Sequence, residues 1–212
     1  MMEFFEILTN VDDYILQIAK DNLWLAYGLL FLIIFAESGN PIFSFLPGDG
    51  LLLTVGIIAS TGVMNVAVVM PLLILAGVLG FYLNYFTGKY AGVKIINGDF
   101  RINEEHLNKT NDFFQKHGTK ALVISRFFPI VRSVAPFVAG MSMLDFYRFQ
   151  RDSIIGAAIW VGFFVGAGYV FGNIPLIREN FFLVYLSVNL SMLSIMVFSA
   201  IKFYLKNRFK GI

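Results

Sequence analysis

The chain has 212 residues, of which 58% are hydrophobic and 14% are charged, whereas about 25% of the residues in an average soluble domain are charged. A formal net charge of +2, without a block of like charges, argues against nucleic acid as a partner. The absence of cysteine excludes disulfides, thiol nucleophiles and Cys-ligated zinc, and no pattern calls for another metal or a cofactor. We therefore expect a protein embedded in a membrane.

Long uncharged stretches predict that the protein crosses the membrane as helices. The longest stretch runs from Gly50 to Gly88, and a helix needs about 20 apolar residues to cross roughly 30 Å of hydrocarbon. The apolar runs are continuous and do not alternate in polarity as transmembrane β-strands do. We predict one all-α membrane domain over residues 1–212, with about four full transmembrane helices plus amphipathic helices.

Residues 1–21 mix acidic and apolar positions and are predicted to form an interfacial helix. The acidic N-terminus lacks the positive region of a signal peptide, so we expect the first hydrophobic segment to be retained. The uncharged stretch 22–36 is short for a crossing and ends at Glu37. We expect Glu37 to lie inside the protein, below the membrane surface, where an acid usually has a function.

A segment broken by proline and glycine follows, and it carries a second acid, Asp49. The residues expected to shape it are Pro41, Pro47 and Gly48. Irregular backbone at membrane depth is tolerated only where it is buried in protein or lines a wet cavity. We therefore predict a re-entrant helical hairpin over 37–60, within a first repeat that covers 22–92 and ends in a full span.

Residues 93–120 are polar, contain both histidines, and are predicted to form a cytoplasmic amphipathic segment. A second interrupted apolar segment follows over 121–143, with Arg126 and Arg132 inside it. Its expected shaping residues are Pro129, Pro136 and Gly140. We predict a second re-entrant hairpin there, inside a second repeat over 121–175, and a final transmembrane helix over 180–205.

The two interrupted segments indicate an inverted repeat. Three residue pairs align at a nearly constant offset: Glu37 with Arg126, Pro41 with Pro129, and Pro47 with Pro136. Such paired breaks are the best sequence pointer to the binding site of an inverted-repeat transporter, although chance similarity of proline-rich breaks is an alternative. If the basic C-terminal tail is cytoplasmic, four crossings place most of the 16 Lys and Arg residues inside and open the hairpins toward opposite faces.

Two acids in one hairpin face two arginines in the other. Arginine binds phosphate bidentately and keeps its charge, so we expect Arg126 and Arg132 to hold a phosphate-bearing substrate. Glu37 and Asp49 are the candidates for relaying protons. The alternative is that the four residues only form ion pairs, in which case the protein is a membrane scaffold that transports nothing.

Two other functions suggested by the sequence are a phosphatase and a homodimer face. A phosphatase using phospho-histidine needs catalytic histidines beside basic residues, but His106 and His117 fall in the polar stretch, so we expect no enzyme activity. The glycines between Gly77 and Gly92 could form a homodimer face, but packing within the chain is the commoner use of such spacing.

The motifs taken together resemble the DedA family of bacterial inner-membrane proteins, which is related to the eukaryotic VTT-domain lipid scramblases. The motifs are Phe35-Ala-Glu37, the run Phe45-Leu-Pro-Gly-Asp49-Gly-Leu-Leu, the glycines from Gly77 to Gly92, and Arg126-Phe-Phe-Pro-Ile-Val-Arg132 followed by Ala139-Gly140. The resemblance covers about residues 25–175. It implies two opposed re-entrant hairpins, with the acid pair at Glu37 and Asp49 and the arginine pair at Arg126 and Arg132.

The resemblance also implies a function. We expect a lipid transporter linked to proton motive force that returns undecaprenyl phosphate from the outer to the cytoplasmic leaflet. The alternatives are a flippase or scramblase of phospholipids such as phosphatidylethanolamine, and the scaffold. The expected location is the bacterial inner membrane, as a multi-pass protein with a cytoplasmic C-terminus whose partners are a lipid substrate and protons.

Overall fold

The computed structural model describes residues 11–40, 48–96, 120–174 and 194. All secondary structure in these ranges is α-helical, which confirms the predicted class, and the helices are α2 (Val11–Asp21), α3 (Leu23–Gly39), α4 (Gly48–Ser60), α5 (Val66–Ile96), α7 (Lys120–Ser125), α8 (Pro129–Met141) and α9 (Phe146–Gly172). Several predictions lie outside the described residues: Pro41, Pro47, both histidines, most of the polar segment and the final transmembrane helix.

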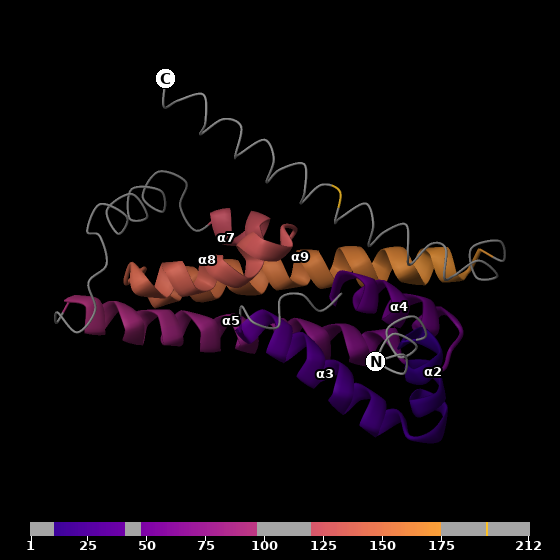
Figure 1. Ribbon diagram of the computed structural model, residues 1–212. Helices are drawn as coiled ribbons and strands as arrows, with labels where there is room; N and C mark the ends of the chain where they lie inside the picture. Colours follow the sequence, from indigo (N-terminus) through magenta and orange to yellow (C-terminus); the bar gives the residue numbers. More distant parts are fainter. Residues whose placement is uncertain (1–10, 41–47, 97–119, 175–193, 195–212) are drawn as a thin grey trace.

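Two helices form the frame of the described part. Within α5 and α9, the segments Val66–Ala91 and Phe146–Gly172 are long and apolar enough to cross a membrane. The rings of Tyr85, late in α5, and Phe149, early in α9, lie 4.4 Å apart, so the two helices run antiparallel. Figure 1 shows them side by side along the length of the molecule. Both extend beyond their uncharged cores because Lys and Arg near a helix end can reach toward the membrane surface.

Helices α3 and α4 both lie in the half of the molecule where α5 begins and α9 ends (Figure 1). Tyr27, early in α3, accepts a hydrogen bond of 3.1 Å from the backbone N–H of Asn65 just before α5. Gly39 at the end of α3 packs on Gly80 in the middle of α5. Helix α4 packs on α9 and ends at Ser60, beside Gly172. Both helices therefore run between that end of the molecule and its middle.

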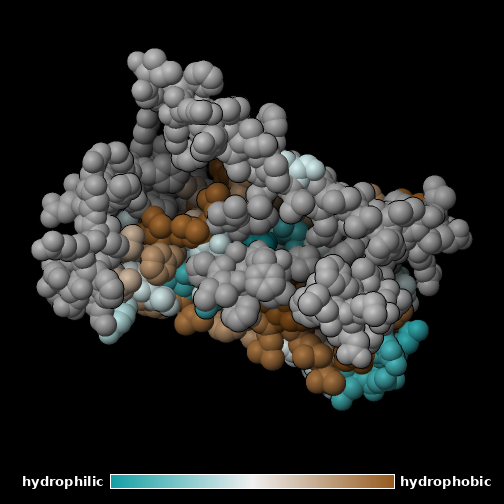
Figure 2. Space-filling view, viewed as in Figure 1, coloured by the Kyte–Doolittle hydropathy of each residue, from teal (hydrophilic) through white to brown (hydrophobic). Residues whose placement is uncertain are grey.

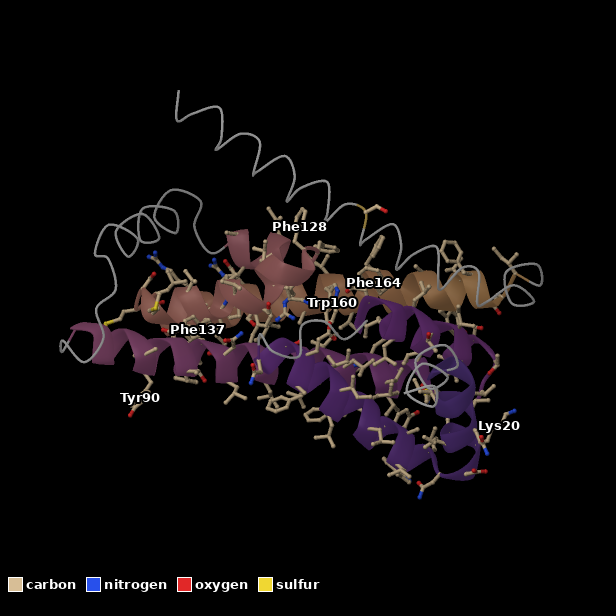
Figure 3. The ribbon with its side chains drawn as sticks, viewed as in Figure 1. Lys20, Tyr90, Phe128, Phe137, Trp160 and Phe164 are labelled. Atoms are coloured by element: carbon tan, nitrogen blue, oxygen red, sulfur yellow. The ribbon has the colours of Figure 1, made fainter. Side chains whose placement is uncertain are left out.

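Helix α3 covers the short uncharged stretch 22–36 and extends beyond it. The helix has 17 residues, about 25 Å at 1.5 Å per residue, and it continues through Glu37 to Gly39 without a break. The predicted hairpin segment 37–60 therefore starts within the last turn of α3. Lys20, on α2, lies at the end where α5 begins (Figure 3). The uncharged stretch 22–36 already indicated a short helix, because it holds only 15 residues.

Helices α7 and α8 occupy the opposite half. Helix α8 packs on α5, where Asn84 Nδ2 donates a hydrogen bond of 2.6 Å to the carbonyl of Ser133. Helix α7 packs on α9, where Gly156 lies close to Val123. Helix α8 ends at Met141, four residues before Asp145 caps the start of α9 with a bond of 3.0 Å to the Arg148 N–H. This pair also reaches only the middle of the molecule.

The shaping residues have different local roles. Gly48 is the first residue of α4 and Pro129 the first of α8, a position where proline fits because its missing N–H has no partner in the helix. Pro136 and Gly140 lie inside α8, which continues through both of them. Pro136 removes one helical hydrogen bond, to the carbonyl of Arg132, yet the helix persists because it is packed along α5.

Glycines allow the helices to pack closely where they cross. A Cβ atom on Gly56 of α4 or on Gly168 of α9 would collide with backbone of the other helix. The same holds for Gly88 of α5 against Phe137 of α8. Small residues at such crossings bring helix backbones into contact in membranes. The glycines Gly77, Gly80 and Gly88 thus have neighbours within the chain.

The outer faces of the long helices are apolar. Exposed large hydrophobic residues follow α3, α5 and α9 at helical spacing and include Leu25, Leu29, Leu32, Leu75, Leu79, Leu83, Ile155, Ile159 and Phe163. Figure 2 shows hydrophobic residues gathered along the lower side of the described part, with hydrophilic residues at its lower right end. Contiguous apolar surface of this extent is rare on soluble monomers and fits contact with lipid.

Candidate functional site

The four charged residues singled out from the sequence lie where the two helix pairs meet. Glu37 is in the last turn of α3, Asp49 in the first turn of α4, Arg126 directly after α7 and Arg132 in α8. All four are buried, with at most 5% of each residue exposed. Charged groups at such depth are costly unless they are paired or functional.

Arg132 joins the two acids. Its Nη1 donates a hydrogen bond of 3.0 Å to Asp49 Oδ1, and its Nη2 donates to Glu37 Oε1. The two carboxylates thus come from separate helices of the first pair, and the cation comes from the second. We call Glu37, Asp49 and Arg132 the acid clamp.

Trp160 completes the clamp from α9. Its Nε1 donates a hydrogen bond of 2.6 Å to Asp49 Oδ1, and the Arg132 guanidinium carbon lies 4.9 Å from the centre of its ring. Figure 3 shows Trp160 midway along α9. A tryptophan can serve in this way because it offers both a π face for the cation and one N–H donor.

Glycine is required at position 48 because the backbone there lies very close to the carboxylate of Glu37. A Cβ atom at this position would overlap the carboxylate of Glu37, so only glycine can begin α4 there without moving the acid. The start of a helix also carries a partial positive charge. The first turn of α4 therefore stabilises the negative charges of Glu37 and Asp49.

Arg126 has different surroundings from Arg132. Its Nη2 lies 3.2 Å from Ser153 Oγ, 3.3 Å from the Ser153 carbonyl and 3.4 Å from the Gly77 carbonyl. Its guanidinium carbon lies 3.6 Å from the centre of the Phe81 ring. In the described ranges no carboxylate pairs with it, and its Nε and Nη1 have no hydrogen-bond partner. The structure thus separates two arginines that looked equivalent in the sequence.

Both short helices begin close in sequence to the charged residues. Helix α4 begins at Gly48, beside the acids, and α8 begins at Pro129, between the two arginines. Helix N-termini favour anions because their free N–H groups and dipole present positive charge. Together with the unpaired Arg126, they give this region a preference for a negatively charged ligand.

Sequence reasoning missed the neutral and aromatic partners of the charges. Trp160, Ser153 and Phe81 sit in apolar spans, where only their capacity to hydrogen-bond or to stack on a cation distinguishes them. It also missed Asp152, a buried acid whose Oδ1 accepts a bond of 2.9 Å from Arg151 Nε. Asp152 directly precedes the uncharged stretch of α9, where an acid is usually exposed at a helix end, so its burial has no signal in the sequence.

The chain is similar to a known domain family and to several named bacterial proteins. The VTT domain family matches residues 46–170. Protein DedA of Escherichia coli (strain K12) is 39% identical over 180 residues, which cover 82% of either chain. Inner membrane protein YqjA of the same organism is 34% identical over 151 residues, covering 70% of this chain and 69% of YqjA. A membrane protein of Mycobacterium leprae (strain TN), described as uncharacterized, is 33% identical over 152 residues, covering 70% of this chain and 68% of that one.

No solved structure matches the chain. Two of these relatives are membrane proteins by name. The segment that the family matches includes Asp49, both arginines and Trp160, and two helices of the described part are long and apolar enough to cross a membrane. The protein is thus a membrane protein that belongs to the DedA family of VTT-domain proteins.

Proposed function

We propose that this protein is a lipid transporter linked to proton motive force, which translocates undecaprenyl phosphate from the outer to the cytoplasmic leaflet. It acts as a carrier and not as an enzyme. The observation that carries the proposal is a buried arginine without a carboxylate partner in the described ranges, beside a second arginine clamped by two acids. The first can bind a phosphate, and the second can respond to protons.

We propose that α3–α4 and α7–α8 are two opposed re-entrant hairpins of an inverted repeat. The packing supports this, because exchanging α3, α4 and α5 with α7, α8 and α9 leaves the main contacts unchanged. Helix α3 packs on α5 as α7 packs on α9, and α4 packs on α9 as α8 packs on α5. In inverted-repeat transporters, substrate and ion sites lie where interrupted helices meet near the membrane midplane.

Arg126 is the proposed first contact of the phosphate. Its free nitrogens can donate to phosphate oxygens, and a charged hydrogen bond of this kind is roughly twice as strong as a neutral one. Phe81 and Ser153 hold its guanidinium in place. The lipid tail would remain against the apolar outer faces of the helices.

Protons would act through the acid clamp. While Glu37 and Asp49 are ionised, they hold Arg132 by two ion pairs. A proton on either carboxyl removes its negative charge and weakens its hold on Arg132, because the charged guanidinium is then bonded to a neutral acceptor and the attraction between opposite charges is lost. Arg132 is then able to turn toward the phosphate. This links proton uptake to substrate binding.

We place the protein in the bacterial inner membrane with its C-terminus in the cytoplasm. The named inner-membrane relative supports the membrane, and the basic residues at the end of the sequence support the orientation. The first helix pair then opens to the outer face, where protons enter, and the second opens to the cytoplasm.

Transport into proteoliposomes tests the proposal. We would follow fluorescent undecaprenyl phosphate and phosphatidylethanolamine with and without an imposed pH gradient. Movement of the prenyl phosphate that follows the gradient is the expected result. Movement of both lipids without dependence on the gradient would identify a scramblase, and no movement of either by folded protein would identify a scaffold.

The variant Asp49→Asn isolates the proton step. Asparagine keeps an oxygen for the Trp160 N–H but carries no charge, so we expect a folded protein that has lost gradient-driven transport. Asp21→Asn is the matched control, because Asp21 is exposed at the end of α2. Full gradient-driven transport by Asp49→Asn would contradict the proposed coupling.

A further inference from the structure

Three buried donor atoms beside the clamp have no hydrogen-bond partner in the described part of the chain. They are Arg126 Nε, Arg126 Nη1 and Ser38 Oγ, and neither residue has exposed surface. Most buried polar atoms in proteins form a hydrogen bond with another protein atom or with water. A cluster of unsatisfied donors therefore indicates a ligand that accepts hydrogen bonds.

Two of these donors, Arg126 Nη1 and Ser38 Oγ, lie close to Gly77 of α5, whereas Arg126 Nε lies beside Gly156 of α9. A Cβ atom at Gly77 would lie 3.2 Å from Arg126 Nη1, 3.9 Å from Ser38 Oγ and 3.8 Å from the ring of Trp160. Ser38 comes from α3, one residue after Glu37, and Arg126 comes from the end of α7. Three segments distant in sequence thus meet at one point. Two of them contribute a hydrogen-bond donor, and the third contributes a glycine.

The other unsatisfied atoms near the site belong to groups that already have an ion-pair partner. Glu37 Oε2 and Arg132 Nε are parts of the acid clamp, and Asp152 Oδ2 belongs to an acid paired with Arg151. Ser38 and Arg126 differ because no ion pair in the described residues involves them.

We propose that Ser38 and Gly77 complete, with Arg126, a pocket for the oxygens of a phosphate monoester. This inference rests on the proposed function and names further binding residues for it. The Ser38 hydroxyl donates to one phosphate oxygen while Arg126 Nη1 donates to another, and Gly77 carries no side chain that would stand between the two donors. Arg132 is not required for this first binding, since its charge is balanced by Glu37 and Asp49.

Gly77→Ala tests the space directly. The nearest atoms to a Cβ there all belong to side chains, so the methyl group fits with small adjustments and blocks the pocket. Gly80, one turn away, behaves differently: its Cβ would lie 2.7 Å from the Phe35 carbonyl and 2.9 Å from the Gly39 nitrogen, both backbone atoms. Gly77→Ala should therefore fold, whereas Gly80→Ala should be destabilised.

Tryptophan fluorescence provides a readout at the site. The chain has two tryptophans, and Trp24 is 80% exposed, so Trp24→Phe leaves Trp160 beside the pocket as the single tryptophan, which is excited selectively over tyrosine. The purified full-length protein in nanodiscs would be titrated with farnesyl phosphate, with farnesol, which has the same tail, and with inorganic phosphate. We expect a saturable signal with farnesyl phosphate and none with farnesol.

Variants in this background assign the binding to the pocket. Ser38→Ala should raise the Kd for farnesyl phosphate about tenfold, the loss expected for one hydrogen bond to a charged group, and Ser38→Thr should restore it. Gly77→Ala should raise the Kd at least as much. Ser125→Ala is the control, because Ser125 is a buried serine next to Arg126 whose hydroxyl already donates to Leu122 at 2.8 Å; its Kd should equal that of the parent.

The outcomes separate this inference from the proposed function. Tight binding by the parent, Ser38→Ala and Gly77→Ala alike would overturn the pocket and leave phosphate-lipid transport standing. No binding of farnesyl phosphate to the parent would overturn both. Equal affinity for inorganic phosphate would keep the pocket but identify its ligand as the free anion, which contradicts a lipid substrate.

Discussion

At the scale of single residues, the site depends on how buried charges are compensated. Arg132 is balanced by two carboxylates, whereas Arg126 is held by a serine, carbonyl groups and an aromatic ring. Removing one partner of a buried charge cluster costs more than neutralising all of its members, since a lone charge stays buried. Stability measurements can therefore show whether the acid clamp is a coupled unit.

The variant Arg132→Gln leaves Glu37 and Asp49 buried without their cation. We expect a loss of about 3–5 kcal/mol in the free energy of unfolding, seen as a lower thermal midpoint in detergent. The triple variant that also carries Glu37→Gln and Asp49→Asn should lose less, because no unpaired charge remains. A triple variant less stable than Arg132→Gln alone would show that the three charges are not coupled.

Trp160 contributes one hydrogen bond to a charged acceptor. Trp160→Phe removes the N–H that donates to Asp49 and keeps an aromatic ring, so we expect a loss of about 1.5–3 kcal/mol. Trp24→Phe is the matched control, because Trp24 is mainly exposed. Chemical unfolding of both variants measures the difference, and equal stability of the two would show that the bond to Asp49 adds nothing.

At the scale of helices, glycine determines how closely the elements pack. Four contacts between helices, α3 on α5, α4 on α9, α8 on α5 and α7 on α9, each have a glycine where backbones approach. Residues Gly39, Gly56, Gly140 and Gly156 occupy these crossings. Such approach brings the tips of the helix pairs near enough for Arg132 to reach acids on α3 and α4.

Two glycines of α9, two residues apart, give an internal comparison. A Cβ on Gly168 would collide with the Leu53 carbonyl, whereas a Cβ on Gly166 meets nothing within 4 Å. We expect Gly168→Ala to lose about 1–3 kcal/mol through overpacking. Gly166→Ala should be neutral or gain about 0.5–1 kcal/mol, since alanine is the better helix former. Thermal unfolding in nanodiscs checks both, and equal midpoints would contradict the close α4–α9 contact.

At the scale of the whole molecule, the arrangement predicts which ends face which side of the membrane. The turn after α4 and the start of α9 lie at opposite ends of the described bundle (Figure 1). In the proposed orientation Lys20 lies at the outer end, whereas Arg148 and Arg151, in the first turns of α9, lie at the other end. The balance of positive charge still favours a cytoplasmic start of α9.

The natural absence of cysteine allows this orientation to be tested. Thr61 and Tyr147 are exposed, the latter at 76%, so Thr61→Cys and Tyr147→Cys provide one label site at each end. In intact spheroplasts, a membrane-impermeant maleimide should label the first variant and not the second. Labelling of both without lysis would rule out the proposed topology, and labelling after lysis controls for accessibility.

Most of the fold class was predictable because it depends on local composition. Uncharged stretches predicted helices at α5 and α9, and the proline and glycine clusters located the breaks near Gly48 and Pro129. The limits of the short helices were less predictable. Helix α3 continues past the uncharged stretch to Gly39. Pro136 lies inside α8, since packing against α5 outweighs the local preference of proline.

The sequence by itself determined that the protein is a helical membrane protein and that four charged residues lie in its interrupted segments, because hydropathy and backbone chemistry act over neighbouring residues. Only the tertiary structure decided the pairing among them. Arg132 bonds to acids 83 and 95 residues away, while Arg126 meets a serine, an aromatic ring and the open position at Gly77. Partners so distant along the chain are selected by how the helices pack, and no local pattern records that choice.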